Sequence, residues 1–192
     1  MMMEKRNNME LLYSYRAPFG RLTLAADGEY LTGLWIDGQK YDRATLQKRE
    51  GLYVCETCDE ISGRSAGAAC AGGVPPVIAD TVRWLELYFS GKQPDFLPPL
   101  KPKGSAFRQE VWKLLQKIPY GQTTAYKRIA EEIAAAHGQR SMSAQAVGGA
   151  VSHNPISILI PCHRVLGTDG SLTGYAGGLE VKKYLLRLEG IL

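Results

Sequence analysis

Short runs of apolar residues, separated by turn residues, mark the first part of the chain. The runs lie at residues 11–13, 22–24 and 31–36, and Pro18-Phe19-Gly20 and Asp27-Gly28 separate them. Asp-Gly between two such runs is typical of a hairpin, because a type I′ turn requires positive φ values that glycine adopts at little cost. The pattern therefore predicts three antiparallel strands, the third closed by Asp37-Gly38.

A change of hydrophobic period follows these strands. Residues 62–73 contain ten Gly, Ala or Ser residues out of twelve, which offer little to pack and much chain entropy to lose. Helical spacing then returns over residues 77–89 and ends at Gly91. We expect an N-terminal α/β domain over residues 1–92, with a flexible Gly/Ala-rich insertion at about 40–76.

Residues 93–104 contain four prolines, which forbid a continuous helix and predict an interdomain linker. The C-terminal domain, residues 105–192, is mostly helical in pattern. Its first apolar stripe has a possible N-cap and ends at Pro119. The stripe and cap residues are Ser105, Phe107, Val111, Leu114, Leu115 and Ile118.

Two short helical patterns follow, one with Tyr126 and Ile129 on its apolar face and one beginning near residues 141–143. The connection between them contains Gly138, which favours a helix-turn-helix, although a plain helical scaffold is the alternative. Val181 and Leu185 belong to the apolar stripe of a last helix. The whole pattern predicts an α+β fold: a small N-terminal antiparallel sheet plus helix, then a mostly helical domain.

Composition and charge narrow the function classes. The 192 residues are 45% hydrophobic and 22% charged, which is enough to bury a core and excludes disordered and collagen-like chains. No apolar run reaches the roughly 18 residues of a membrane span, and the N-terminus lacks an apolar signal core, so a cytoplasmic location without membrane contact is expected. Residues 101–192 hold 12 Lys and Arg against 6 Asp and Glu. This basic half is typical of contact with a polyanion, or of a solvated basic face.

Pro161-Cys162-His163-Arg164 is the most informative stretch. A free cysteine is nucleophilic only as its thiolate, and a neighbouring base or positive charge lowers its pKa. The preceding residues 156–160 have the composition of a buried extended segment, which would direct Cys162 and His163 to opposite sides. Contact between them would then require a bridging water or a turn. The alternative is a buried, inert cysteine beside a hydrogen-bonded histidine.

The second half resembles the O6-alkylguanine-DNA alkyltransferases, also called methylated-DNA–protein-cysteine methyltransferases. The resemblance covers residues 104–190, and the N-terminal strands are similar to that family's variable first domain. It rests on five motifs in the family's order: residues 158–165, residues 146–150, Asn154-Pro155, Gly174-Tyr175 and residues 185–190.

The resemblance implies DNA repair by a single, irreversible transfer of an alkyl group from O6 of guanine to Cys162, with O4 of thymine left open as a second donor. His163 would be the base, acting through a water, and Glu189 the carboxylate that orients it, in the manner of other nucleophile–base–acid sites. Asn154 would brace the active-site turn, and the Tyr126 hydroxyl would serve the departing guanine. The reaction demands no metal or organic cofactor.

The resemblance also implies a DNA partner. We expect a monomer that binds double-stranded DNA through the minor groove and flips the alkylated guanine out of the stack. The expected DNA- and base-binding residues are Ala144, Gln145, Ala146, Gly148, Gly149, Arg164, Val165, Tyr175 and Ala176. Gln145 stands where the family commonly has an arginine that fills the space left by the flipped base. Arg140 and His153 lie nearby in the sequence.

Two other functions use the same residues. An alkyltransferase-like protein would recognise damaged guanine without repairing it, but those relatives lack the cysteine that this chain has at Cys162. An unrelated thiol hydrolase would turn over repeatedly and ignore DNA.

The remaining cysteines, Cys55, Cys58 and Cys70, form a CxxC with a third thiol. A structural zinc site requires four ligands, and residues 1–100 contain no histidine. We expect these thiols to be unligated, with zinc as the weaker alternative.

Overall fold

The computed structural model describes residues 10–46 and 74–192. The chain divides into two compact units. The first comprises Met1–Asp37 and Asp42–Pro102, and the second comprises Gly38–Tyr41 and Lys103–Leu192. The segment Gly38–Tyr41 therefore belongs to the second unit, although the residues before and after it belong to the first.

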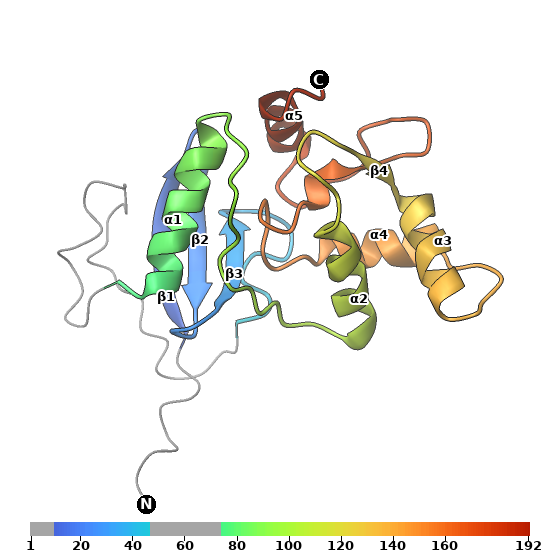
Figure 1. Ribbon diagram of the computed structural model, residues 1–192, viewed down its shortest axis with the longest axis horizontal. Helices are drawn as coiled ribbons and strands as arrows, with labels where there is room; N and C mark the ends of the chain where they lie inside the picture. Colours follow the sequence, from blue (N-terminus) through green and yellow to red (C-terminus); the bar gives the residue numbers. More distant parts are fainter. Residues whose placement is uncertain (1–9, 47–73) are drawn as a thin grey trace, which may run out of the picture. The chain divides into compact units, whose positions relative to one another are not determined.

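The first unit contains a three-stranded antiparallel sheet in the order β1-β2-β3, with α1 along one face (Figure 1). The elements are β1 Leu11–Ala17, β2 Gly20–Ala26, β3 Leu31–Ile36 and α1 Pro76–Phe89. The sheet and helix pack through fully buried side chains, among them Leu22, Leu24, Leu34, Ile78 and Leu85. The predictions of three antiparallel strands and a following helix are confirmed.

The connection between β2 and β3 differs from the type I′ hairpin that Asp27-Gly28 predicts. It extends to Tyr30, and the Asp27 carboxylate accepts hydrogen bonds from the backbone N–H of Glu29 and of Tyr30, at 3.3 and 2.9 Å. Gly28 still has a positive φ of 101°. The Asp27 side chain thus bonds its own turn in a longer loop, in the way that Asx turns do.

Part of the proline-rich segment lies against β3. The Leu31 N–H donates to the Pro99 carbonyl and the Lys101 N–H donates to the Leu31 carbonyl, both at 2.8 Å. Lys101 also forms an ion pair with Asp27 at 2.9 Å. We predicted this segment to be an interdomain linker. These hydrogen bonds and the ion pair attach its end to the first unit.

The second unit is mainly helical, with one very small parallel sheet. Its elements are α2 Ala106–Leu115, β4 Thr124–Ala125, α3 Tyr126–Ala136, α4 Ala144–Ser152, the 3₁₀ turn η1 Cys162–Arg164, β5 Val165–Leu166 and α5 Leu179–Leu188. Ser105 and Ser143 cap α2 and α4 by accepting from the N–H of Arg108 and of Ala146. The α+β fold class is confirmed.

The core of this unit lies between α2, α3 and α4. Val111, Trp112 and Val147 are fully buried there, and the Trp112 indole N–H donates to the Ala150 carbonyl at 3.0 Å. Gly138, shortly after the end of α3, has a φ of 63°. A residue without Cβ adopts this left-handed conformation at little cost. No helix among residues 10–46 and 74–192 has the length and apolar character to span a membrane.

Residues 156–160 are buried as predicted, but the prediction that they form an extended segment is wrong. The Leu159 N–H donates to the Ser157 carbonyl and the Ile160 N–H to the Ile156 carbonyl, which makes this stretch a compact turn. Ile158 has a φ of 72°. A positive φ is strained for a β-branched residue, so the surrounding packing must hold this conformation.

Candidate active site

Cys162 lies at the start of η1, immediately after this turn. The residue is only 4% exposed, and its N–H donates to the Ile160 carbonyl at 2.8 Å. Asn154 braces the same place with both ends of its amide. Its Nδ2 donates to the Ile160 carbonyl at 2.8 Å and to Cys162 Sγ at 3.2 Å, and its Oδ1 accepts from the Ile156 N–H at 3.0 Å. The sulfur is therefore held in one position.

Burial raises the pKa of the Cys162 thiol, because a thiolate loses hydration there. The Asn154 hydrogen bond and the positive charge of Lys182 act in the opposite direction. The resting form is the thiol, and a base must remove its proton before the sulfur can act as a nucleophile.

His163, Arg164 and Glu189 form a buried charged cluster next to this cysteine. His163 Nε2 lies 2.7 Å from Glu189 Oε1, while Arg164 donates from Nε to Glu189 Oε2 at 2.8 Å and from Nη2 to Oε1 at 3.0 Å. Arg164 also donates from Nη1 to the Ile118 carbonyl at 2.7 Å. Arg164, which we expected on the base-binding side, is thus directed inward.

The charge states of the cluster follow from burial and hydrogen bonding. Burial lowers the pKa of His163, so the ring is neutral at pH 7 and can accept a proton. Burial alone would raise the pKa of Glu189, but the hydrogen bonds from His163 and Arg164 outweigh it and lower the pKa to about 2. The carboxylate is charged at pH 7 and stabilises any positive charge that develops on His163.

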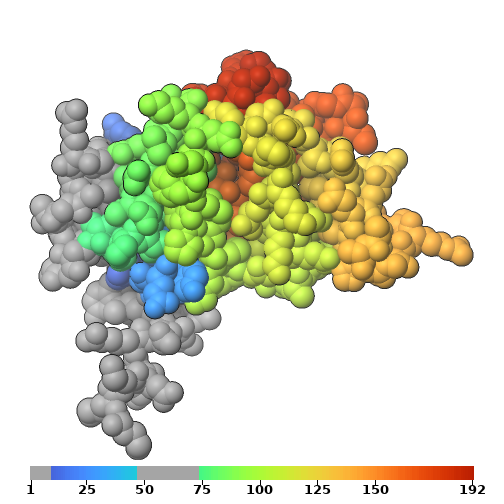
Figure 2. Space-filling view, viewed as in Figure 1, coloured from blue at the N-terminus to red at the C-terminus, as the bar shows by residue number. Residues whose placement is uncertain are grey.

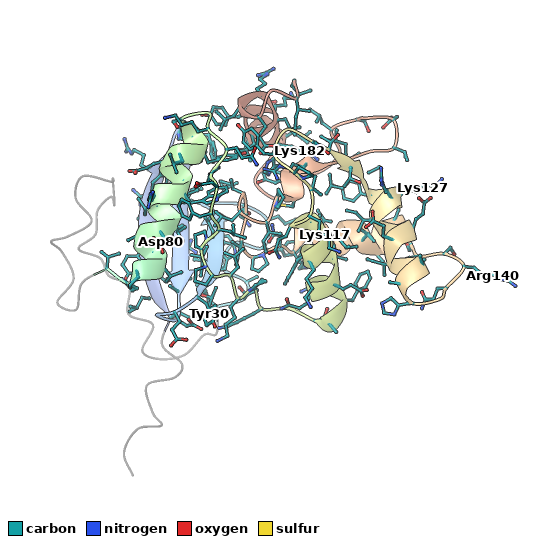
Figure 3. The ribbon with its side chains drawn as sticks, viewed as in Figure 1. Tyr30, Asp80, Lys117, Lys127, Arg140 and Lys182 are labelled. Carbon is teal, nitrogen blue, oxygen red and sulfur yellow. The ribbon has the colours of Figure 1, made fainter. Side chains whose placement is uncertain are left out.

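Lys182 is a candidate site residue that sequence reasoning missed. Its side chain is fully buried, and Nζ donates to the Val165 carbonyl at 2.7 Å and the Thr173 carbonyl at 2.9 Å (Figure 3). Burial lowers its pKa to about 8, while negative charge on Cys162 raises it. Lys182 therefore ties β5 to the segment before Tyr175 and places a positive charge near the sulfur.

Two tyrosines border the site. Tyr126, at the start of α3, donates from its hydroxyl toward the Gly174 carbonyl at 3.5 Å, and burial raises its pKa. The pKa of Tyr175 is raised well above its ordinary value. Burial is the largest cause, and negative charge on Cys162 raises the pKa further. Both hydroxyls stay protonated at neutral pH and can donate hydrogen bonds.

The cavity at Cys162 is small, about 10 Å³, which is close to the volume of a single water site. It is lined by Val151, Ser152, Asn154, Ser157, Cys162, Gly174, Tyr175 and Ala176. Four expected site residues, Asn154, Cys162, Tyr175 and Ala176, meet here. Val165 is fully buried behind the cysteine.

The outward face of α4 carries the small residues that the sequence places there. Ala144, Gln145, Ala146 and Gly149 are exposed, whereas Val147 and Ala150 are buried. Gly148 is half-buried, and a Cβ there would lie 3.8 Å from the Tyr126 ring. In Figure 3, Lys127 projects from the neighbouring helix α3, and Arg140 from the connection between α3 and α4. Figure 2 shows the light orange atoms of α3 and this connection at the surface.

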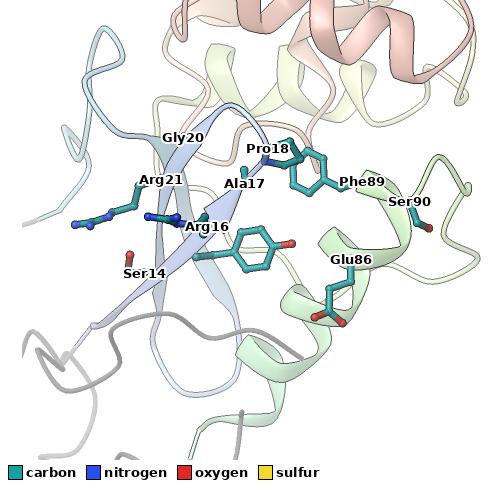
Figure 4. Close-up of a pocket in the computed structure, with 10 residues that line it drawn as sticks. Ser14, Arg16, Ala17, Pro18, Gly20, Arg21, Glu86, Phe89 and Ser90 are labelled. Carbon is teal, nitrogen blue, oxygen red and sulfur yellow. The ribbon is translucent and has the colours of Figure 1, made fainter. Parts of the chain in front are cut away.

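A much larger cavity, about 840 Å³, lies in the first unit at the β1–β2 turn and the end of α1 (Figure 4). Arg16, Arg21, Glu86 and Phe89 are among the residues that line it, and it contains neither cysteine nor histidine. Size alone therefore does not locate the chemistry of this protein. Cys55, Cys58 and Cys70 lie outside the described residues, and the described residues contain no cluster of three or more groups suited to a metal ion.

Together these features place a buried cysteine next to a neutral histidine that is paired with a buried carboxylate, on an α+β fold. Two family models match the chain: the ribonuclease-like domain of 6-O-methylguanine DNA methyltransferase over residues 11–102, and the DNA binding domain of the same family over residues 106–191. The chain belongs to this 6-O-methylguanine DNA methyltransferase family, which confirms the resemblance seen in the sequence.

Individual relatives agree with this assignment. A methylated-DNA–protein-cysteine methyltransferase of Haemophilus influenzae is 38% identical over 178 residues, covering 92% of this chain and 84% of that protein. The protein of the same name from Methanosarcina barkeri is 52% identical over 110 residues, covering 57% of this chain and 66% of that protein. The crystal structure of Mycobacterium tuberculosis OGT in complex with DNA is 36% identical, with a TM-score of 0.69 and 93% and 92% coverage.

Proposed function

We propose that this protein repairs DNA by transferring an alkyl group from O6 of guanine to its own Cys162, once per molecule. The observation that carries the proposal is the placement of Cys162. Its sulfur accepts a hydrogen bond from Asn154 and lies one residue from a neutral histidine paired with a buried carboxylate. Membership of the family supports the same reaction.

The chemistry is a displacement at an sp³ carbon. The Cys162 sulfur forms a bond to the alkyl carbon while the bond from that carbon to guanine O6 breaks, and the electron pair passes to the guanine. A soft thiolate suits this attack. The product is a thioether, and no group of the described site is suited to cleaving it, which supports a single turnover.

Each site residue then has a role in the proposal. His163 takes the thiol proton through a water, and Glu189 stabilises the charged ring. Asn154 positions the sulfur, and the Tyr126 hydroxyl donates to the leaving guanine. Tyr175 and Ala176 form the wall against the base. We place Arg164 with Glu189 rather than with the base, because its guanidinium is already occupied by the carboxylate and Ile118.

Double-stranded DNA with an alkylated guanine is the proposed partner. We propose that the protein acts as a monomer and approaches DNA through the minor groove. The small exposed residues Ala144, Ala146 and Gly149 of α4 support this approach, because among the exposed residues of this helix Gln145 alone has a side chain long enough to read base edges. In this proposal α3 and α4 act as a helix-turn-helix, and residues 105–192 form the DNA-binding domain after an N-terminal domain (1–92) and a linker (93–104). A cytoplasmic location would keep the Cys162 thiol reduced.

The test is to mix the protein with duplex DNA containing O6-methylguanine and to locate any added methyl group by peptide mass. We expect one methyl group per molecule, on Cys162. The Cys162→Ala variant should transfer nothing but bind the damaged duplex as the parent does, because one thiol contributes little to holding a polyanion. Repeated turnover would favour a thiol hydrolase, and equal activity in the variant would exclude Cys162 as the acceptor.

A further inference from the structure

The segment Gly38–Tyr41 follows β3 directly but packs as part of the second unit. Ser157 Oγ donates to Gln39 Oε1 at 3.2 Å, and Gln39 is only 7% exposed. The Lys40 N–H donates to the Ala176 carbonyl at 2.9 Å. These are two separate hydrogen bonds to the cysteine-bearing unit.

Tyr41 adds an aromatic contact to the same unit. Its ring stacks on that of His153, with centroids 3.8 Å apart and planes inclined by 22°. Tyr41 has a φ of 64°, a left-handed conformation that is costly for a residue other than glycine. Such a conformation persists only where the surroundings hold it, and it is frequent at functional sites.

Each of the three contacts is made to a residue that lines the cavity at Cys162 or adjoins the lining in the sequence. Ser157 and Ala176 are two of the residues that line it. Ala176 follows Tyr175 in the pocket wall, and His153 precedes Asn154, which bonds the sulfur. The segment Gly38–Tyr41 therefore contacts Ser157 and Ala176, which line the cavity, and His153, which is next to Asn154.

The cavity at Cys162 is too small for the base that the proposed reaction requires. A volume of about 10 Å³ holds a water molecule and not a purine, so a wall must shift before an alkylated guanine can enter. Gly174, Gly177 and Gly178 flank Tyr175 and Ala176, and Gly178 has a φ of 88°. Glycines permit such a shift at low cost, while the bond from Lys40 to Ala176 opposes it.

We propose that Gln39, the Lys40 amide and the Tyr41 ring limit how far this wall opens, and so favour small alkyl groups over bulky ones. They are positioning residues, because they act through Ser157, Ala176 and His153. This inference rests on the proposed function and adds a determinant of alkyl-group size to it. Loosening the segment should widen the pocket while Cys162, His163 and Glu189 remain in place.

The experiment compares Gln39→Ala and Tyr41→Ala with the parent protein. Single-turnover rates are measured on duplexes that contain O6-methylguanine or O6-benzylguanine. The variants should raise the benzyl-to-methyl rate ratio about fivefold. A change of this size corresponds to no more than the net free energy of one hydrogen bond. Gln93→Ala, an exposed glutamine of the first unit, is the matched control and should leave the ratio unchanged.

A second measurement needs no DNA. Cys162 is labelled with iodoacetamide and with a bulky maleimide, and its peptide is quantified by mass. Faster labelling by the maleimide in the two variants supports the proposal, whereas an unchanged rate ratio with unchanged or slower labelling overturns it. If the parent transfers no alkyl group, the proposed function fails, and the labelling alone decides whether the segment restrains the wall. Should Gln39→Ala not fold, Gln39→Met keeps the volume and removes the bond to Ser157.

Discussion

Arg164 and Glu189 form a two-point ion pair in which both carboxylate oxygens accept from one guanidinium, at 2.8 and 3.0 Å. The same carboxylate holds His163 at 2.7 Å and accepts from the Gly121 N–H at 3.3 Å. The Glu189 side chain has no exposed surface. One buried carboxylate therefore joins the end of α5, the turn of the nucleophile and the segment after α2.

This carboxylate should make the stability of the protein depend on acid. The pKa of Glu189 falls from 4.5 to about 2 on folding, so the unfolded chain binds more protons between these pH values. Stability from this group is complete above pH 4.5 and is lost toward pH 2, and it amounts to about 3 kcal/mol. Urea unfolding at several pH values should show that Glu189→Gln is less stable at pH 7, with the difference shrinking below pH 4.5. A pH-independent difference would contradict this.

Activation of the sulfur should depend on His163 and Glu189. His163→Ala or Glu189→Gln should slow alkyl transfer at pH 7, because burial raises the pKa of Cys162 and the base that removes its proton is lost or weakened. The rate deficit should shrink toward alkaline pH, where the thiolate forms unaided. Single-turnover rates across pH 6 to 9 measure it. A constant deficit would mean that these residues act by packing.

Lys182→Met should lower the rate of transfer more than it lowers DNA binding. The change removes the positive charge that lowers the pKa of Cys162, and a rise of one unit reduces the thiolate fraction about tenfold. Transfer rates and the pH dependence of thiol labelling measure the effect. Lys183→Met is the matched control, since Lys183 lies on the same helix but pairs with Glu180 at the surface. Equal transfer rates in the Lys182→Met and Lys183→Met variants would show that Lys182 does not contribute to the reaction.

Gln145→Arg should strengthen duplex binding. Gln145 is exposed at the start of α4. If it occupies the position from which the family's arginine fills the place of the flipped base, an arginine there adds a cation facing phosphate and a longer side chain for that place. We expect a salt dependence steeper by about one ionic contact and faster repair of duplex relative to single-stranded substrate. Gln93→Arg adds the same charge in the first unit and should reproduce neither effect. If Gln145→Arg leaves the duplex affinity, the salt dependence and the duplex-to-single-strand rate ratio unchanged, Gln145 does not have this role, and Arg140 and His153 become the candidates for it.

Much of this architecture could be predicted because local signals agree with the packing. The alternating runs before Asp37 form the predicted strands, and Ser105 and Ser143 cap helices where serine side chains are expected to. Cys162, His163 and Glu189 were found from a short motif and a resemblance. Their mutual geometry could not be predicted, since it depends on residues 26 positions apart in the chain.

Three features could not be predicted because tertiary packing overrides the local pattern. Residues 156–160 have the composition of a strand, but the bonds of Asn154 bend them into a turn. Lys182 sits among the apolar residues of α5, and the carbonyls of Val165 and Thr173 accept its hydrogen bonds and so make its burial possible. A lysine beside Val181 and before Leu185-Leu186 was the available signal. The contacts of Gln39 had no local signature at all.

Because Ile158 has a left-handed backbone, the environment of Cys162 cannot be transferred to another protein as a short sequence motif alone. A free peptide with the sequence of residues 158–165 would relax this residue to a negative φ, because nothing would oppose the relaxation. The bend that brings Cys162 Sγ to the Asn154 amide would then be lost, together with the buried neighbours that surround the sulfur. Short grafts of the motif into other scaffolds should yield ordinary thiols, and a graft that reproduces the reactivity has to carry the packed shell around Ile158 with it.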